Sequence, residues 1–88
     1  MGTETGRPPT ADEVSGELSA FLAKGSGHEV GPDDDYFALG LVNSLFALEL
    51  VTFVEWRFGL EVGVEDLELD HFRTVVRLTD FVLRKTAG

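Results

Sequence analysis

The run GLVNSLFALELVTFVEWRF, residues 40–58, contains the most apolar helix-like segment of the chain. A long loop-like stretch precedes it, and Ser44 lies at the junction between the two. Helical spacing places one group of apolar residues on a single side and predicts that they face the core: Ala47, Leu50, Val51, Val54 and Phe58. Leu45, Leu48 and Trp56 lie on the opposite side among polar residues, so the helix is apolar nearly all round. Such a helix is either central or partly reserved for a partner.

The segments before this helix are predicted to form one helix and one long loop. A capping box of Thr10 and Glu13 starts the first helix, which we expect to end near 24–25 at a glycine. Its apolar residues have the spacing of one helix face: Val14, Leu18, Phe21 and Leu22. Residues 25–43 are rich in Gly and Asp and are predicted to form a loop with a short helical turn at 36–39. A loop this long in a small domain is usually functional or disordered, and its aromatic residues favour packing over disorder.

The segments after the loop predict two long helices and one short helix. The central helix is expected to span 44–58 and to end at Gly59. Residues 60–64 have a strand-like composition but no strand to pair with, so we expect a loop followed by a short helix at 65–69. The last helix is predicted at 74–86, with four residues facing inward: Val75, Leu78, Phe81 and Val82.

Length and composition favour one small helical domain. The chain has 88 residues and no cysteine, which excludes a disulfide or a thiolate metal site. Three long helices and one short helix predict an all-α four-helix bundle with a long loop between the first two, formed by a single domain at 10–88. Residues 1–9 are predicted to be a disordered tail. The sequence shows neither a membrane-spanning apolar run nor a signal-peptide pattern, so we expect a cytoplasmic protein.

The charge is strongly acidic and unevenly placed. Sixteen acidic and seven basic residues give a formal net charge of −9, which argues against a nucleic-acid partner. Residues 28–70 contain eleven acids and one base, Arg57. A field of one sign over the middle of the chain would attract basic partners. The alternative is a solvated acidic surface that only aids solubility.

Few residues offer catalytic or metal-binding chemistry. The acids at 33–35 resemble the start of a calcium loop, but Ala38 and Ser44 stand where that loop requires Gly and Glu, and we expect no metal site. Ser44 lacks a Gly-x-Ser-x-Gly environment, and a catalytic pair with His71 is a weak alternative. A serine that begins a helix is usually a cap, but Asn43 is itself a good cap and frees the serine hydroxyl. The exposed amides and the helix dipole at this position favour an attached phosphodiester.

Two further runs carry a family resemblance. The run DDDYFALGLVNSL at 33–45 combines an acidic loop, a Phe-x-x-Leu-Gly turn and a serine that opens a helix, and ELDHFRTV follows at 68–75. Together with size, acidity and helix order, these runs resemble acyl carrier proteins. The resemblance implies an acyl-carrier-type four-helix bundle, whose third helix and fourth-helix start lie in the second run. It also implies covalent 4′-phosphopantetheine, transferred from coenzyme A to Ser44, with Asn43 and Leu45 beside it.

The resemblance implies a group carrier and not an enzyme. The attached arm would supply the thiol that the chain lacks and would hold acyl groups as thioesters. A separate phosphopantetheinyl transferase would attach the arm, and acyl-loading and acyl-modifying enzymes would dock on the second helix. We expect five residues in that docking surface: Leu45, Leu48, Glu49, Glu55 and Trp56. Exposed ion pairs contribute only about 0–1 kcal/mol each, which suits transient docking of a monomeric carrier.

The resemblance extends to a subgroup, with one departure from the family pattern. Asn43 stands where the family usually has Asp, which removes a negative charge beside the phosphate. The runs at 40–48 and 65–75 look most like free-standing carriers of actinomycete-type polyketide and antibiotic pathways, which hold glyceryl units that become hydroxymalonyl and methoxymalonyl extender units. The implied partners are a glyceryl-loading enzyme, dehydrogenases, an O-methyltransferase and a polyketide synthase acyltransferase. Two alternatives stay open: a helical interaction module without a prosthetic group, and a hydrolase that uses Ser44.

Overall fold

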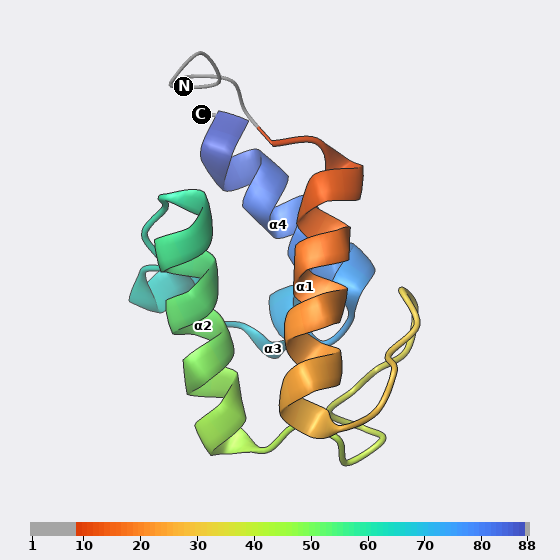
Figure 1. Ribbon diagram of the computed structural model, residues 1–88. Helices are drawn as coiled ribbons and strands as arrows, with labels where there is room; N and C mark the ends of the chain where they lie inside the picture. The colour runs from red at the N-terminus through yellow and green to blue at the C-terminus, as the bar shows by residue number, and fades with distance from the viewer. Residues whose placement is uncertain (1–8, 88) are drawn as a thin grey trace.

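The helical bundle predicted from the sequence is confirmed. The computed structural model describes residues 9–87, and this range contains four α-helices and no strand (Figure 1). A 3₁₀ turn, η1 (Val64–Asp66), lies among the helices, which are α1 (Ala11–Ser26), α2 (Ser44–Phe58), α3 (Leu69–Phe72) and α4 (Val75–Ala87). The predicted disordered tail at 1–9 lies, apart from Pro9, outside the described residues.

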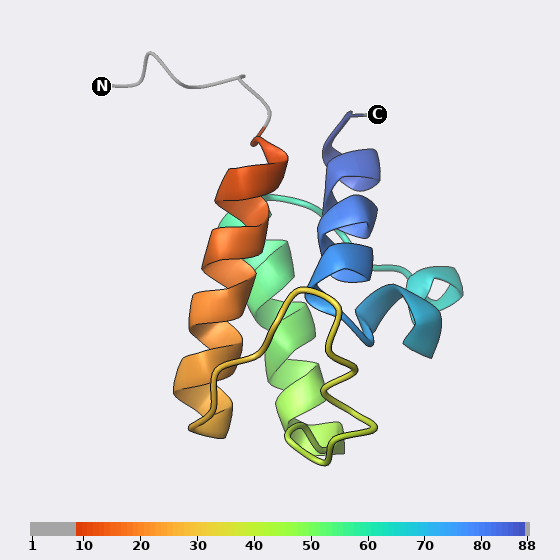
Figure 2. The same cartoon turned by 90° about the vertical axis from the view of Figure 1, so that its right-hand side faces the viewer.

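The three long helices differ in how they meet. α1 runs in the opposite direction to α2 and α4 (Figure 1). It packs mainly against α4 and touches α2 at fewer places. The loop between α1 and α2 runs across one side of the bundle, and the free ends of α1 and α4 lie at the same end of the molecule (Figure 2). α2 therefore has one side on the bundle and one side open.

The core joins the inward sides of the helices with residues from the loop. On α4, all four residues predicted to face inward are buried. On α2, Leu50 and Val54 are fully buried, while the other predicted core residues pack partly buried against them. The buried apolar residues are Val14, Leu18, Leu22, Val30, Tyr36, Val42, Leu50, Val54, Phe72, Val75, Leu78, Phe81 and Val82.

α1 begins as predicted but ends later. The Glu13 amide donates to Thr10 Oγ1 (3.2 Å), and the Thr10 amide donates to Glu13 Oε1 (2.9 Å), which completes the capping box. The predicted end at 24–25 is wrong, because Gly27 takes the left-handed conformation (φ 78°) that stops the helix. Gly25 has a different role: a Cβ atom there would collide with the ring of Phe46, so the missing side chain lets α1 and α2 approach closely.

The loop between α1 and α2 packs against the bundle. The Tyr36 amide donates to the carbonyl oxygen of Arg73 (3.2 Å), and the Tyr36 side chain is fully buried. Burial, together with the negative charge of Asp35, raises the pKa of the Tyr36 hydroxyl. The predicted helical turn is present, because the Leu39 amide donates to the carbonyl oxygen of Asp35 (3.0 Å). The loop thus positions the start of α2.

The short helix lies at a different place from the one predicted. Instead of a helix at 65–69, the chain forms η1 and then α3. The Gly63 amide donates to Asp66 Oδ2 (3.1 Å), and Lys85 Nζ on α4 lies 2.8 Å from the same oxygen. These contacts turn the chain at η1, and a helix restarts only at Leu69. The last helix agrees with the prediction to within one residue, with Thr74 Oγ1 accepting from the Arg77 amide (3.0 Å) as its cap.

Candidate functional site

Ser44 is the first residue of α2, and its neighbour does the capping. Asn43 has an extended backbone, and its Oδ1 accepts a hydrogen bond from the Phe46 amide (2.9 Å). Ser44 is exposed, and its hydroxyl has no hydrogen-bond partner among the described residues. The prediction that Asn43 caps the helix is therefore confirmed. The cap leaves the serine oxygen accessible.

The surroundings of Ser44 suit a phosphodiester. Within the described part of the chain, the amides of Ser44 and Leu45 make no hydrogen bond, as is usual for the first turn of a helix. The first turn of α2 contains no acidic residue. Free amides and the positive end of the helix dipole both stabilise an attached anion, and no carboxylate in that turn opposes it.

An apolar groove opens beside Ser44. It has a volume of about 370 Å³ and lies between α2 and the α3 region. Apart from Ser44 and Glu68, its lining is apolar: Phe37, Ala47, Leu48, Leu50, Val51, Leu67 and Phe72. The sequence did not single out Phe37, Leu67 or Phe72 as site residues, because they come from three separate segments that only the fold brings together.

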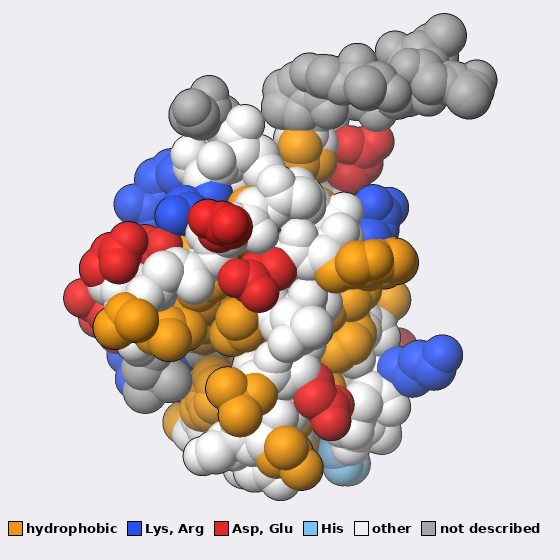
Figure 3. All heavy atoms as spheres, turned by 90° about the vertical axis from the view of Figure 1, so that its left-hand side faces the viewer, with side chains coloured by type: hydrophobic (Ala, Val, Ile, Leu, Met, Phe, Trp, Pro, Cys, Tyr) orange, Lys and Arg blue, Asp and Glu red, His pale blue; other side chains and the backbone are white. Residues whose placement is uncertain are grey.

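Four of the five predicted docking residues lie in the open on α2. The exposed fractions are 67% for Leu45, 64% for Leu48 and 79% for Trp56, and Glu49 is also exposed. Hydrophobic side chains are accordingly visible over this face of the molecule (Figure 3). All four are thus available to a partner.

Glu55 differs from the other predicted docking residues. It is half-buried, and its Oε2 accepts a hydrogen bond from the Val62 amide (2.8 Å). Its carbonyl oxygen accepts from the amides of Gly59 and Leu60 (3.0 and 3.2 Å). Glu55 therefore holds the turn that follows α2. The sequence pattern gave no sign of this, because the contact spans a glycine turn that breaks the helical period.

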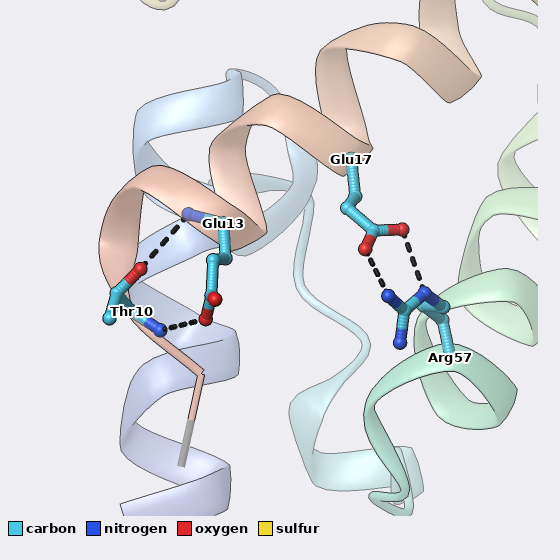
Figure 4. A network of polar contacts seen from close by, with 4 residues as sticks. All are labelled: Thr10, Glu13, Glu17 and Arg57. Carbon is cyan, nitrogen blue, oxygen red and sulfur yellow. Dashed lines mark hydrogen bonds and ion pairs between the residues drawn. The ribbon is translucent and has the colours of Figure 1, made fainter. Parts of the chain in front are cut away.

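Two contacts that the sequence did not predict join α1 to α2. Glu17 and Arg57 form a two-pronged ion pair, with Arg57 Nε 2.7 Å from Glu17 Oε1 (Figure 4). Phe21 of α1 stacks on Phe53 of α2, with ring centroids 4.3 Å apart, and on Phe46 at 5.4 Å. The aromatic stack and the ion pair fill the otherwise sparse contact between these helices.

The two histidines take no part in this site. His71 stacks on Phe81 (5.1 Å between ring centroids), and its Nε2 lies 3.9 Å from Glu68 Oε1. Among the described residues no hydrogen bond joins His71 to Ser44. His28 is exposed in the loop after α1. Over 9–87, no group of His, Asp and Glu side chains is arranged to hold a metal ion, and no helix is long and apolar enough to cross a membrane.

The all-α bundle, with a free serine at the start of α2, agrees with the acyl-carrier-type bundle that the sequence resemblance implied. Comparison with protein families finds a match over residues 12–82 to the phosphopantetheine attachment site, and the chain belongs to this family. The family-level resemblance noted in the sequence is thereby confirmed, as is the covalent cofactor, 4′-phosphopantetheine. Domains of this family are generally acyl carriers without catalysis of their own, and they interact with a phosphopantetheinyl transferase and acyl-handling enzymes. Among curated proteins, none matches the chain.

Proposed function

We propose that Ser44 is the attachment point of 4′-phosphopantetheine and that the chain presents acyl groups from this position. One observation carries the proposal: Ser44 is exposed at the first position of α2, and its hydroxyl is free because Asn43 caps the helix. When bound, the group supplies a terminal thiol that holds an acyl unit as a thioester. The chain contains no cysteine and has no thiol of its own for this purpose.

The residues around Ser44 have separate roles in this proposal. Asn43 fixes the helix end through its bond to the Phe46 amide. The free amides of Ser44 and Leu45 and the helix dipole favour the negative phosphodiester, by about 0.3–1 kcal/mol for an exposed charge. No base is needed next to Ser44, since a separate transferase activates the hydroxyl. The exposed residues of α2 then serve as the docking surface: Leu45, Leu48, Glu49 and Trp56.

We also propose that the cargo is a glyceryl-derived unit, converted to hydroxymalonyl or methoxymalonyl for polyketide assembly. The resemblance of the runs at 40–48 and 65–75 to free-standing carriers of this kind supports it. The partners would be a glyceryl-loading enzyme, dehydrogenases, an O-methyltransferase and a polyketide synthase acyltransferase. The chain would act in the cytoplasm as a monomer.

The attachment can be tested by intact mass. The chain is incubated with coenzyme A and a broad-specificity phosphopantetheinyl transferase, and the wild type should gain one prosthetic group. Ser44→Ala should gain none while keeping its helical circular dichroism, and the matched variant Ser19→Ala on α1 should be modified like the wild type. A mass gain in Ser44→Ala contradicts the proposal. An unchanged wild type, beside a control carrier that is modified, contradicts it as well.

The cargo requires a different measurement. Mass spectrometry of the chain isolated from its native host should show a glyceryl, hydroxymalonyl or methoxymalonyl thioester on the arm. A plain alkyl acyl chain would contradict the cargo while leaving the carrier role intact.

A further inference from the structure

Arg73 joins the loop that precedes Ser44 to the short helix α3. It follows α3 directly, and its guanidinium lies between two carboxylates from different segments. Its buried Nε is 3.1 Å from Oδ2 of Asp35 in the loop, a charge contact without hydrogen-bond geometry. Its Nη1 donates to Asp70 Oδ1 on α3 (2.9 Å). Arginine suits such a bridge, because its planar head presents several donors in fixed directions.

The backbone around the start of α4 supports the same attachment. The carbonyl oxygen of Arg73 accepts from the Tyr36 amide (3.2 Å), and the Val76 amide donates to the carbonyl oxygen of Pro32 (3.0 Å). The loop therefore passes close to the start of α4 (Figure 2). Two backbone hydrogen bonds and one ion pair thus fix loop residues 32–36.

The attached part of the loop leads to Ser44 within a few residues. Asp35 Oδ1 accepts from the Ala38 amide (3.0 Å), so the carboxylate of the ion pair also holds the turn at 36–39. Residues 40–43 follow this turn, and the last of them caps α2. Because α2 touches α1 and α4 at few places, the position of its first turn depends on the loop.

The charge of Arg73 keeps two acidic segments together. Asp35 and Asp70 approach the same guanidinium, so without it two carboxylates would face each other and repel. In the pair with Asp35 the side chains are only 37% and 30% exposed, whereas Asp70 is 68% exposed, so the first pair is less screened by solvent. Loss of Arg73 therefore removes an attachment and also pushes the loop away from α3.

We propose that Arg73 is a positioning residue for the modification of Ser44: it latches the loop to α3 and thereby fixes where the first turn of α2 presents the serine hydroxyl. The proposal rests on the proposed function, since modification of Ser44 is the step that the latch serves. Arg73 lies outside the docking surface on α2, so its loss should leave binding of the transferase in place and slow the transfer itself. A misplacement of about 1 Å in a reacting group can lower a rate about 100-fold, so a loosened loop has a measurable effect.

Steady-state kinetics of Ser44 modification, combined with a charge rescue, test the proposal. Arg73→Gln should lower kcat about tenfold and change the KM for the carrier less than about twofold. Adding Asp70→Asn to this variant removes the repulsion and should raise kcat again by about threefold or more, although a further polar group is lost. Arg73→Lys should lie between Arg73→Gln and the wild type, since one ammonium does not reproduce the two-sided bridge. The matched control is Arg84→Gln, which removes an arginine that pairs with Asp80 one turn away on α4 (3.4 Å) and should behave like the wild type.

Hydrogen exchange followed by mass spectrometry measures the latch without the prosthetic group. In Arg73→Gln the amides of residues 34–42 should exchange about tenfold faster, as for local opening of one segment. The amides of α1 should keep their wild-type rates, because the buried contacts between α1 and α4 do not involve the latch. The double variant with Asp70→Asn should exchange more slowly in the loop than Arg73→Gln alone.

The outcomes separate the latch from other roles of Arg73. Wild-type kcat in Arg73→Gln overturns the proposal, whether or not the loop exchanges faster. A rise in KM in place of the fall in kcat overturns it too, because Arg73 would then contribute to docking. A loss of helical circular dichroism that Asp70→Asn does not restore would make Arg73 a determinant of the whole fold and also contradicts the latch. A wild type that gains no prosthetic group overturns the proposed function instead, and hydrogen exchange still tests the latch.

Discussion

The interface of α1 with α4 and the outer side of α2 both carry large apolar residues, yet they have opposite surroundings. Six residues of the first are fully buried: Val14, Leu18, Leu22, Val75, Leu78 and Val82. On the second, Leu45 and Leu48 are about two-thirds exposed, at 67% and 64%. Residue type alone therefore does not show whether an apolar side chain stabilises the fold or is exposed to a partner. The difference lies in whether the opposite side of the helix is polar, as in α4, or apolar nearly all round, as in α2.

The largest expected effect comes from the same substitution made in both regions. Leu78→Ala leaves a cavity in the core and should lower the free energy of unfolding by about 3 kcal/mol. Leu48→Ala removes an exposed side chain and should change it by no more than about 0.5 kcal/mol. Urea unfolding followed by circular dichroism measures both. Equal losses would show that the outer side of α2 is part of the core after all.

The Asn43 cap of α2 gives the next largest effect, and the size of this effect depends on the prosthetic group. Asn43→Ala should cost about 1 kcal/mol of stability, because the Phe46 amide loses its acceptor. Asn43→Asp keeps the cap and adds a negative charge at the helix N-terminus, which should stabilise the unmodified chain by about 0.3–1 kcal/mol at low salt. After attachment this gain should shrink, since the introduced carboxylate and the phosphodiester repel each other. If Asn43→Asp stabilises the modified chain as much as the unmodified one, the phosphate does not lie near this helix end, which contradicts the proposal.

The smallest expected effect concerns the ion pair that joins η1 to α4. The hydrogen bond from Lys85, and then that from the Gly63 amide, lowers the pKa of Asp66 below its ordinary value of 3.8. A lowered carboxyl pKa stabilises the fold above the ordinary value, and this contribution is lost as the pH falls through the lowered pKa. Asp66→Asn should therefore flatten the loss of stability on acidification below pH 3.8. Asp33→Asn, at an exposed loop position, serves as the control. Identical acid profiles for Asp66→Asn and the wild type would contradict the coupling.

The sequence predicted what local chemistry determines. The bounds of α2 followed from Asn43 as a cap and Gly59 as a left-handed stop (φ 66°), and both are observed. The inward residues of α4 followed from a clear helical period. The cap at Asn43 could likewise be assigned from two adjacent cap-type residues, which left Ser44 free.

What the sequence missed depends on contacts between distant segments. Gly25 was predicted to stop α1 because glycine commonly ends helices. In the structure its missing side chain instead leaves room for the ring of Phe46 on α2. The short helix begins later in the chain than predicted, because Asp66 in the turn before it binds Lys85, nineteen residues away. The contact between α1 and α2 depends on the stacking of Phe21 on Phe53, a pairing that no local pattern encodes.

We propose that Ser44 is the single attachment point of the arm, and peptide mapping by tandem mass spectrometry tests this proposal. The chain contains four serines, namely Ser15, Ser19, Ser26 and Ser44. After modification with coenzyme A and a phosphopantetheinyl transferase, the arm should be found on the peptide containing Ser44 and on no other. An arm on a serine of α1, or a Ser44 peptide that stays unmodified while the intact mass increases, would contradict it.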